Sequence, residues 1–126
     1  MISIITPNLN GSKFLENCIQ NKIKQKKYLE YIIVDGGSTD KSLEIIKKYN
    51  FVNLIIKKDK NMYEAINNGI NISKHPIVTY INVDDNYCDN VLEYVLTIFN
   101  SNPDIDFIYG DTNILDNKGN LLYKYK

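Results

Sequence analysis

The 126-residue chain contains no arginine and no tryptophan, and it has only two cysteines, three prolines and one histidine. Fifteen lysines balance fifteen acidic residues, so the formal net charge is zero. A neutral chain without arginine lacks the basic surface that nucleic-acid binding requires, so we expect no nucleic-acid partner. Cys18 and Cys88 are too few and too far apart for a disulfide framework or a zinc site. A reduced, cytoplasmic setting is therefore expected.

Long apolar segments are also missing from the sequence. No apolar run approaches the roughly 20 residues that a membrane-spanning helix needs. The first seven residues lack the basic start and the longer apolar stretch of a signal peptide. The composition, with 44% apolar and 24% charged residues, is typical of a folded globular chain and argues against disorder. The length suits one domain and is too short for two ordinary ones.

Short apolar runs alternate with helical patterns along the chain. Short apolar runs predict strands at 2–5, 31–34, 54–56 and 76–81, and the first two are expected to be buried on both faces. Apolar spacings of three to five residues predict helices at 12–23, 43–49, 62–73 and 91–99, the first capped by Ser12. A fifth strand is expected at 105–109, before a hairpin turn at 117–120 and an extended segment at 121–125. This order predicts an α/β fold with a doubly wound, mostly parallel sheet.

Acidic side chains follow several of the expected strands. They are Asp35 after the second strand, the adjacent pair Asp84 and Asp85 after the fourth, and Asp111 after the fifth. Ligands bind beyond the carboxyl ends of parallel strands, so we expect these four carboxylates to converge on one edge. Crowded carboxylates favour a bound cation, and aspartate oxygens suit Mg²⁺ or Mn²⁺. A single aspartate is often only a loop or cap residue, as we expect for Asp40, but an adjacent pair after a buried strand is a stronger indication.

Five blocks of residues stand in a definite order along the chain. They are SIITP at 3–7, YIIVDGGSTD at 31–40, DKNMYEAINNG at 59–69, YINVDD at 80–85 and YGD at 109–111. Together these blocks resemble family 2 glycosyltransferases of the GT-A fold, and the resemblance covers nearly the whole chain. Any one block alone would be a weak indication.

The resemblance implies a nucleotide-diphospho-sugar donor, in the first place a UDP-sugar, with Mn²⁺ or Mg²⁺ as cofactor. It implies an inverting hexosyl transfer to a glycan or lipid-linked acceptor in bacterial polysaccharide or cell-surface glycan synthesis. Such an enzyme works in the cytoplasm, in some cases at the inner face of the membrane as a peripheral protein.

The resemblance also implies roles for individual residues. Asp85 would bind the metal, Asp84 would lie near the ribose, and Asp35 would accept hydrogen bonds from the base. Asp111 is the catalytic candidate, near the donor sugar. The full set implied to border the nucleotide is Thr6, Pro7, Asn8, Asp35, Asp59, Asn67 and Asp84.

The chain departs from the family pattern at three points. Leu9 stands where many relatives have a tyrosine that can stack on the base, and Ile66 stands where some have an arginine near the diphosphate. Relatives also continue into an acceptor-binding half that usually supplies the general base. We therefore expect residues 1–126 to form a single donor-binding domain without that half, and to transfer sugar poorly alone.

Two functions from different classes remain open, a sugar transferase and a nucleotide-sugar-binding module without turnover. A signalling receiver domain is disfavoured, because receivers have an acid pair after the first strand, where this chain has Thr6-Pro7-Asn8. A Rossmann dehydrogenase is disfavoured because no Gly-x-Gly-x-x-Gly motif follows any expected strand. His75, beside Pro76, is expected in a surface loop and not as a catalytic base.

Overall fold

The computed structural model describes residues 1–126 and contains one parallel sheet, a separate hairpin and four α-helices. None of these helices combines the length and apolar character needed to cross a membrane. The elements in chain order are β1 (Ile2–Asn8), α1 (Ser12–Ile23), the 3₁₀ turn η1 (Lys26–Tyr28), β2 (Leu29–Asp35), α2 (Ser42–Ile46), β3 (Val52–Ile56), α3 (Met62–Ile72), β4 (Ile77–Tyr80), α4 (Val91–Ser101), β5 (Thr112–Leu115) and β6 (Leu121–Tyr125). The predicted α/β class is confirmed, and so are the first four strands.

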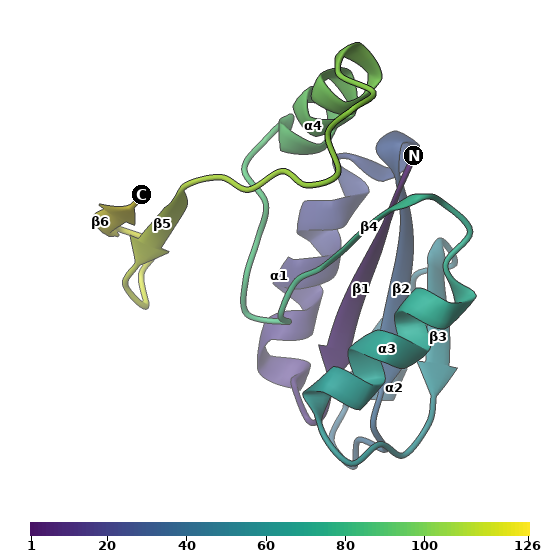
Figure 1. Ribbon diagram of the computed structural model, residues 1–126. Helices are drawn as coiled ribbons and strands as arrows, with labels where there is room; N and C mark the ends of the chain where they lie inside the picture. The colour runs from purple at the N-terminus through teal and green to yellow at the C-terminus, as the bar shows by residue number, and fades with distance from the viewer.

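The main sheet is parallel and has the strand order β3-β2-β1-β4. Strand β1 lies between β2 and β4, and its last residue, Asn8, is paired in register with Asp35. The chain therefore moves outward from β1 through β2 to β3 and then returns to the other side of β1 (Figure 1). Such a reversal opens a crevice at the carboxyl ends of the strands, where ligands of open α/β sheets bind.

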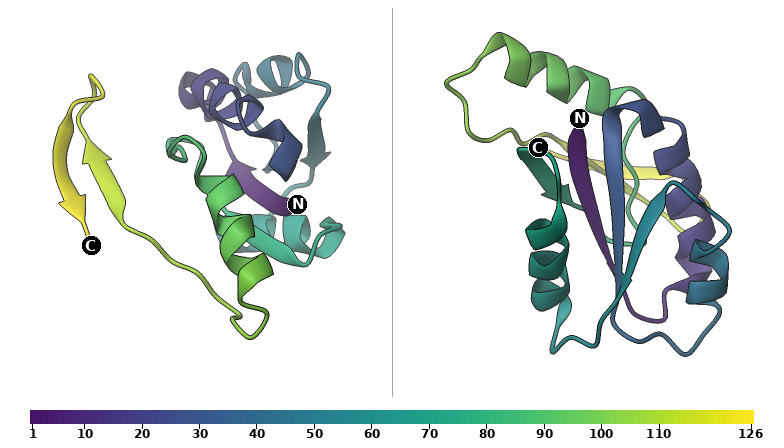
Figure 2. Two further views of the ribbon diagram at one scale, coloured as in Figure 1. Left: turned by 90° about the horizontal axis from the view of Figure 1, so that it is seen from above. Right: turned by 90° about the vertical axis from the view of Figure 1, so that its right-hand side faces the viewer.

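Helices cover both faces of the sheet (Figure 2), and alternate strand residues bury toward each face. Toward α1 and α2, the core contains Ile4 and Ile33 together with Leu92 of α4. Toward α3, a smaller cluster contains Ile5 and Val34 with Ala65 of the helix. The continuous apolar runs in β1 and β2 are thus explained by burial on both sides.

The structure corrects the predicted start of α1. Ser12 is the first helical residue rather than the cap; Gly11 occupies the cap position and supplies no side-chain hydrogen bond. The missing cap comes from a distant loop, because the Ser12 backbone N–H donates to Oδ2 of Asp40 at 3.0 Å. The other oxygen of Asp40 accepts from the backbone N–H of Ser42, in the first turn of α2, at 2.9 Å. Asp40 is therefore a cap, as predicted, and it serves two helices.

The segment after α4 differs most from the prediction. Residues 105–109 do not form the expected fifth strand; Phe107 and Tyr109 are 78% and 87% exposed. The turn at 117–120 is present, with Gly119 at a φ of +84°. It joins β5 to β6 in an antiparallel hairpin that belongs to a sheet of its own and stands apart from the main body (Figures 1 and 2). A strand needs a neighbour for its backbone hydrogen bonds, and none lies beside residues 105–109.

Candidate functional site

A cavity of about 490 Å³ lies at the carboxyl end of the sheet. It is bounded by the loop after β1, by the segment that leads from β3 into α3, and by the loop after β4. The lining residues are 7–11, 14, 59–62, 65 and 82–84. The predicted site residues Pro7, Asn8, Asp59 and Asp84 are among them, so four predicted residues from three parts of the sequence meet at one cavity.

Asp35 is completely buried next to Asn8, which lines the cavity, and it organises the loop after β2. Its Oδ2 accepts hydrogen bonds from Nδ2 of Asn8 and from Oγ of Ser38, both at 2.7 Å. Its Oδ1 accepts from the backbone N–H groups of Gly37, at 2.9 Å, and Ser38, at 2.7 Å. A carboxylate has about four acceptor positions, so this one is fully used within the protein. Asp35 therefore fixes both Asn8 and the 36–38 loop.

Asn8 is the link between the Asp35 network and the cavity. Its side-chain amide donates to Asp35, which leaves Oδ1 as a buried acceptor without a partner. A Cβ at Gly11 would lie only 2.4 Å from this oxygen. Glycine is therefore required at position 11 by the close approach of Asn8, and a donor from a bound ligand or water would offset the unpaired acceptor.

The turn before α3 brings Asp59 and Lys60 to the cavity. Asn61 caps α3 by accepting from the Glu64 backbone N–H at 3.0 Å, and the Glu64 carboxylate accepts from the Lys60 backbone N–H at 2.7 Å. This reciprocal capping fixes the turn. The amino end of α3 and the Lys60 ammonium then present positive charge, an arrangement that favours anions such as phosphates.

Asp84 and Asp85 stand in the loop after β4, with Asp84 in the cavity wall and Asp85 exposed beside it. Partial burial and the neighbouring Asp84 charge raise the pKa of Asp85. The structure contains no group of three or more His, Cys, Asp or Glu side chains that could enclose a metal. Mg²⁺ is commonly held by only one or two carboxylates together with substrate phosphates and waters. The crowded acid pair therefore fits a divalent cation that a diphosphate would help to bind.

A buried polar cluster lies behind the site, and it includes Thr6. The Tyr31 hydroxyl donates to Oγ1 of Thr6 at 3.1 Å and lies 3.2 Å from Sγ of Cys18. Burial raises the pKa of Tyr31, and burial lowers the pKa of the nearby Lys22 ammonium. Thr6 itself is fully buried, so it supports the cavity from behind and does not line it.

Two further predicted site residues lie elsewhere. Asn67 occupies an exposed position on α3 and is not part of the cavity wall. Asp111 precedes the hairpin strand β5, where its carboxylate pairs with Lys124 at 3.6 Å. The expected convergence of four carboxylates at one edge is therefore wrong for Asp111, because the strand that would have delivered it to the main sheet is absent.

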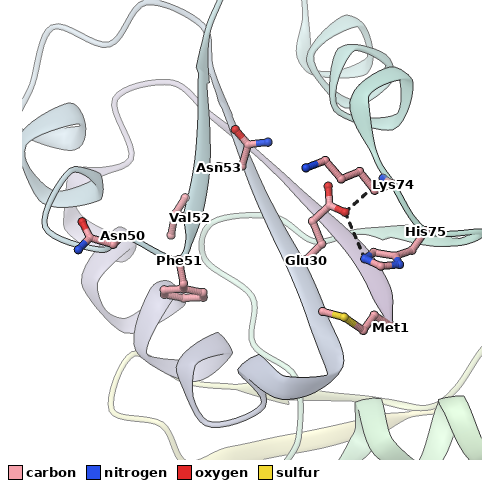
Figure 3. A pocket seen from close by; sticks show the side chains of 8 residues that line it. All are labelled: Met1, Glu30, Asn50, Phe51, Val52, Asn53, Lys74 and His75. Carbon is pink, nitrogen blue, oxygen red and sulfur yellow. Dashed lines mark hydrogen bonds and ion pairs between the residues drawn. The ribbon is translucent and has the colours of Figure 1, made fainter.

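A second cavity, of about 610 Å³, lies at the opposite end of the sheet and contains His75 (Figure 3). His75 pairs with Glu30 at 3.5 Å, and Glu30 also accepts from the Lys74 backbone N–H at 3.2 Å. Ser3 donates to the same carboxylate. These contacts tie the starts of β1, β2 and β4 together, which gives His75 a structural role.

Several cavity residues were not predicted from the sequence. Phe14 belongs to the apolar spacing that predicts the helix at 12–23, but it is 42% exposed and lines the cavity. Met62 and Leu9 add further apolar surface there, and Lys60 adds a cation. The signal for Lys60 and Met62 was their place beside Asp59 in the block at 59–69. No local pattern distinguishes Phe14 from the core residues of the same helix.

Comparison with known proteins defines first the class and then the family. Two solved structures have the same fold. Staphylococcus aureus TarS 1-349 in complex with UDP matches with a TM-score of 0.71 at 24% identity over 81% of this chain. The mannosyltransferase PcManGT from Pyrobaculum calidifontis in complex with GDP-Man and Mn²⁺ matches with a TM-score of 0.72 at 17% identity over 91% of this chain. The fold is therefore that of GT-A-type glycosyltransferases. The profile described as Glycosyl transferase family 2 matches residues 3–121. The chain belongs to this family.

Curated relatives agree with this assignment. Glycosyltransferase GlyG of Streptococcus pneumoniae serotype 4 is 30% identical over 99% of the chain. A PGL/p-HBAD biosynthesis glycosyltransferase of Mycobacterium bovis is 32% identical over 88% of it. The chain spans 43% of the length of the first relative and 46% of the second. It also covers 32% of the TarS chain and 35% of the PcManGT chain.

Proposed function

We propose that this chain is the donor-binding part of an inverting glycosyltransferase, and that it binds a nucleotide-diphospho-sugar in the 490 Å³ cavity. The observation that supports this most directly is the meeting of two kinds of groups at one cavity. The acid pair after β4 provides negative charge for a cation, while Lys60 and the amino end of α3 provide positive charge for phosphates. A nucleoside diphosphate with a divalent cation satisfies both.

The cavity offers complementary surfaces for the parts of such a ligand. Leu9, Phe14 and Met62 supply apolar area for the base and the ribose. Asn8, held by Asp35, supplies polar contacts on the same side, so Asp35 acts through the residues that it orients. The diphosphate then extends from the Lys60 side toward Asp84 and Asp85, which is consistent with the predicted roles of this pair.

Asp85, with Asp84 beside it, would hold a Mn²⁺ or Mg²⁺ ion, whose charge stabilises a departing nucleoside diphosphate. Lys60 and the backbone N–H groups at the start of α3 would orient the same phosphates. An inverting transfer also needs a base that accepts the proton of the acceptor hydroxyl. No histidine lies at this cavity, and Asp111 pairs with Lys124 away from it.

The relatives support a UDP-sugar as the first donor to test and a glycan or lipid-linked acceptor. One structural neighbour was solved with UDP and another with GDP-Man and Mn²⁺. The mycobacterial relative acts in PGL/p-HBAD biosynthesis. We propose a role in bacterial polysaccharide or cell-surface glycan synthesis, as a hexosyltransferase in the cytoplasm or peripherally at the inner membrane face.

A nucleotide-sugar-binding module without turnover is the second candidate. It is favoured by one observation, that Asp59 and Asp84 are the acids that line the cavity and that the proposed function uses both loops for the nucleotide and the metal. Donor binding alone does not separate the two functions. Sugar transfer to an acceptor separates them.

The proposal is tested by thermal unfolding with UDP, GDP or dTDP, each with and without Mn²⁺. We expect UDP with Mn²⁺ to stabilise the chain, by about 2.7 kcal/mol when the ligand is at 100 times its dissociation constant. Uridine with Mn²⁺ is the control, because it lacks the diphosphate. Identical unfolding in the presence of all three nucleotides and in buffer would refute nucleotide binding.

The acid pair is tested by Asp85→Asn, which keeps the side-chain shape and removes the charge. We expect UDP affinity in the presence of Mn²⁺ to fall about tenfold or more, while UDP affinity without metal changes little. Asp40→Asn, at an aspartate that caps helices, is the matched control and should leave nucleotide affinity unchanged. Calorimetric titration measures both. Equal losses in the two variants would mean that the metal site lies elsewhere.

A further inference from the structure

Lys22 of α1 is buried to 1% exposure, although it is a lysine. Its ammonium donates to Sγ of Cys18 at 3.5 Å and to the backbone carbonyl of Asp85 at 3.4 Å. It also lies 5.5 Å from the ring centroid of Tyr87 and 6.0 Å from that of Tyr31. No carboxylate oxygen lies within ion-pair distance of it. The charge is therefore held by a carbonyl, a thiol and two aromatic rings.

In this environment the buried ammonium of Lys22 does not favour folding. Removing an ammonium from water is unfavourable unless a paired charge compensates it, and an apolar side chain of similar volume is often as stable or more stable at such a site. The other buried positions on the same helix, Leu15, Cys18 and Ile19, follow the usual rule and are apolar. The contacts of Lys22 with the loop after β4 therefore need a different explanation.

The loop after β4 has no regular secondary structure between residues 81 and 90, and side chains from α1 and from Gln25 just after it hold the loop in shape. Asn21 donates to the Tyr87 carbonyl at 2.9 Å and accepts from the Tyr87 N–H at 3.0 Å. Gln25 donates to the Cys88 carbonyl at 3.2 Å and accepts from the Leu92 N–H at 3.1 Å. These two residues hold the later part of the segment. Lys22 is the member of the set that contacts Asp85 itself.

We propose that Lys22 is a positioning residue for the Asp84–Asp85 pair: its buried ammonium anchors the Asp85 backbone so that the two carboxylates face a divalent cation and the nucleotide diphosphate. This inference rests on the proposed function, because it assigns a role within the same site. Lys22 does not touch the ligand. Its effect is confined to the metal-dependent part of nucleotide binding, which is the ratio of the UDP dissociation constants without and with Mn²⁺.

The test is Lys22→Met, which keeps an unbranched side chain and removes the charge and the donor. We expect the ratio of UDP dissociation constants without and with Mn²⁺ to fall about tenfold, the lower range for groups that orient metal ligands. The dissociation constant without Mn²⁺ should not change, and the urea midpoint of unfolding should stay the same or rise. Lys24→Met is the matched control, because Lys24 is an exposed lysine next to α1 and should leave all three quantities unchanged.

A double-mutant cycle with Asp85→Asn identifies the route of the effect. Because Asp85→Asn already removes the metal-dependent part, adding Lys22→Met should cause no further change in the ratio. An independent further loss would show that Lys22 acts elsewhere and would overturn the proposal. Lys22→Leu is the second variant, and if both variants unfold or lose stability, Lys22 has a structural role and the proposal is wrong.

The same experiment separates this inference from the proposed function. If the unmodified chain binds none of UDP, GDP and dTDP with Mn²⁺, the proposed function fails and the positioning role fails with it. If the unmodified chain binds UDP with Mn²⁺ and Lys22→Met binds it with the same metal dependence, only the positioning role is overturned.

Discussion

At the scale of single residues, the carboxylates of this chain have distinct tasks that their local sequence does not reveal. Asp35 and Asp40 lie in the same block at 31–40, yet Asp35 is completely buried with four hydrogen bonds, and Asp40 caps two helices. The carboxylates of Asp84 and Asp85 cap no helix and form no ion pair, and both residues are exposed in the loop after β4. The role of each carboxylate therefore depends on the hydrogen-bond donors that surround it.

Asp40 predicts a pH dependence of stability. Hydrogen bonds from Ser42 and Ser12 hold the pKa of Asp40 well below its ordinary value. A lowered folded-state pKa stabilises the fold above the unfolded value of about 3.9, and this contribution is lost as the pH falls below that value. We expect Asp40→Asn to be less stable than the parent at pH 7 and to lose less stability between pH 5 and pH 2 (about the range of aspartate titration).

Urea unfolding at a series of pH values measures this difference. Asp104→Asn is the control, because Asp104 is an exposed aspartate outside the helix caps. The expectation is contradicted if Asp40→Asn and Asp104→Asn have the same pH dependence as the parent.

At the scale of elements, α3 packs closely against the sheet because Gly69 has no side chain at the contact. A Cβ at Gly69 would lie 2.6 Å from Cγ2 of Ile5, which is closer than carbon atoms can pack. The helical glycine therefore allows α3 to approach β1, although glycine lowers helix propensity. The amino end of the same helix borders the cavity, so this close packing also sets one wall of the site.

Gly69→Ala should therefore destabilise the chain despite the better helix propensity of alanine. Overpacking of this kind typically reduces the free energy of unfolding by about 1–3 kcal/mol. Gly110→Ala is the control, because nothing lies within 4 Å of the added Cβ. Chemical denaturation measures both variants. A Gly69→Ala variant as stable as the parent would mean that α3 shifts away from β1 without loss.

At the scale of the whole molecule, the cavity offers groups for the nucleotide and the metal but no base for an acceptor hydroxyl. Its acids serve the nucleotide and metal side in the proposed function, and Asp111 lies on the hairpin with Lys124. Inverting transfer requires a base within about 3 Å of the acceptor hydroxyl, opposite the departing diphosphate. We therefore expect these 126 residues to bind a nucleotide sugar and to form little or no glycoside, with at most slow donor hydrolysis.

Incubation with UDP-sugars and a panel of acceptors, followed by mass spectrometry of the products, tests this expectation. The parent chain is compared with Asp111→Asn, which removes the one acid outside the nucleotide and metal side that the sequence suggested as a base. Rapid glycoside formation that disappears in Asp111→Asn would contradict the expectation and identify Asp111 as the base.

The local pattern of the sequence determined the alternation of strands and helices, the burial of β1 and β2 on both faces, and the acid pair directly after β4. These features depend on residues close together in the chain, so periodicity and breaker residues are sufficient to predict them. The tertiary structure alone decided that Asp40 caps α1, that Asp35 has no free acceptor position, that Lys22 reaches Asp85, and that Asp111 lies away from the sheet. Each of these depends on which distant donor or strand lies opposite a residue, and that is set by packing rather than by local sequence.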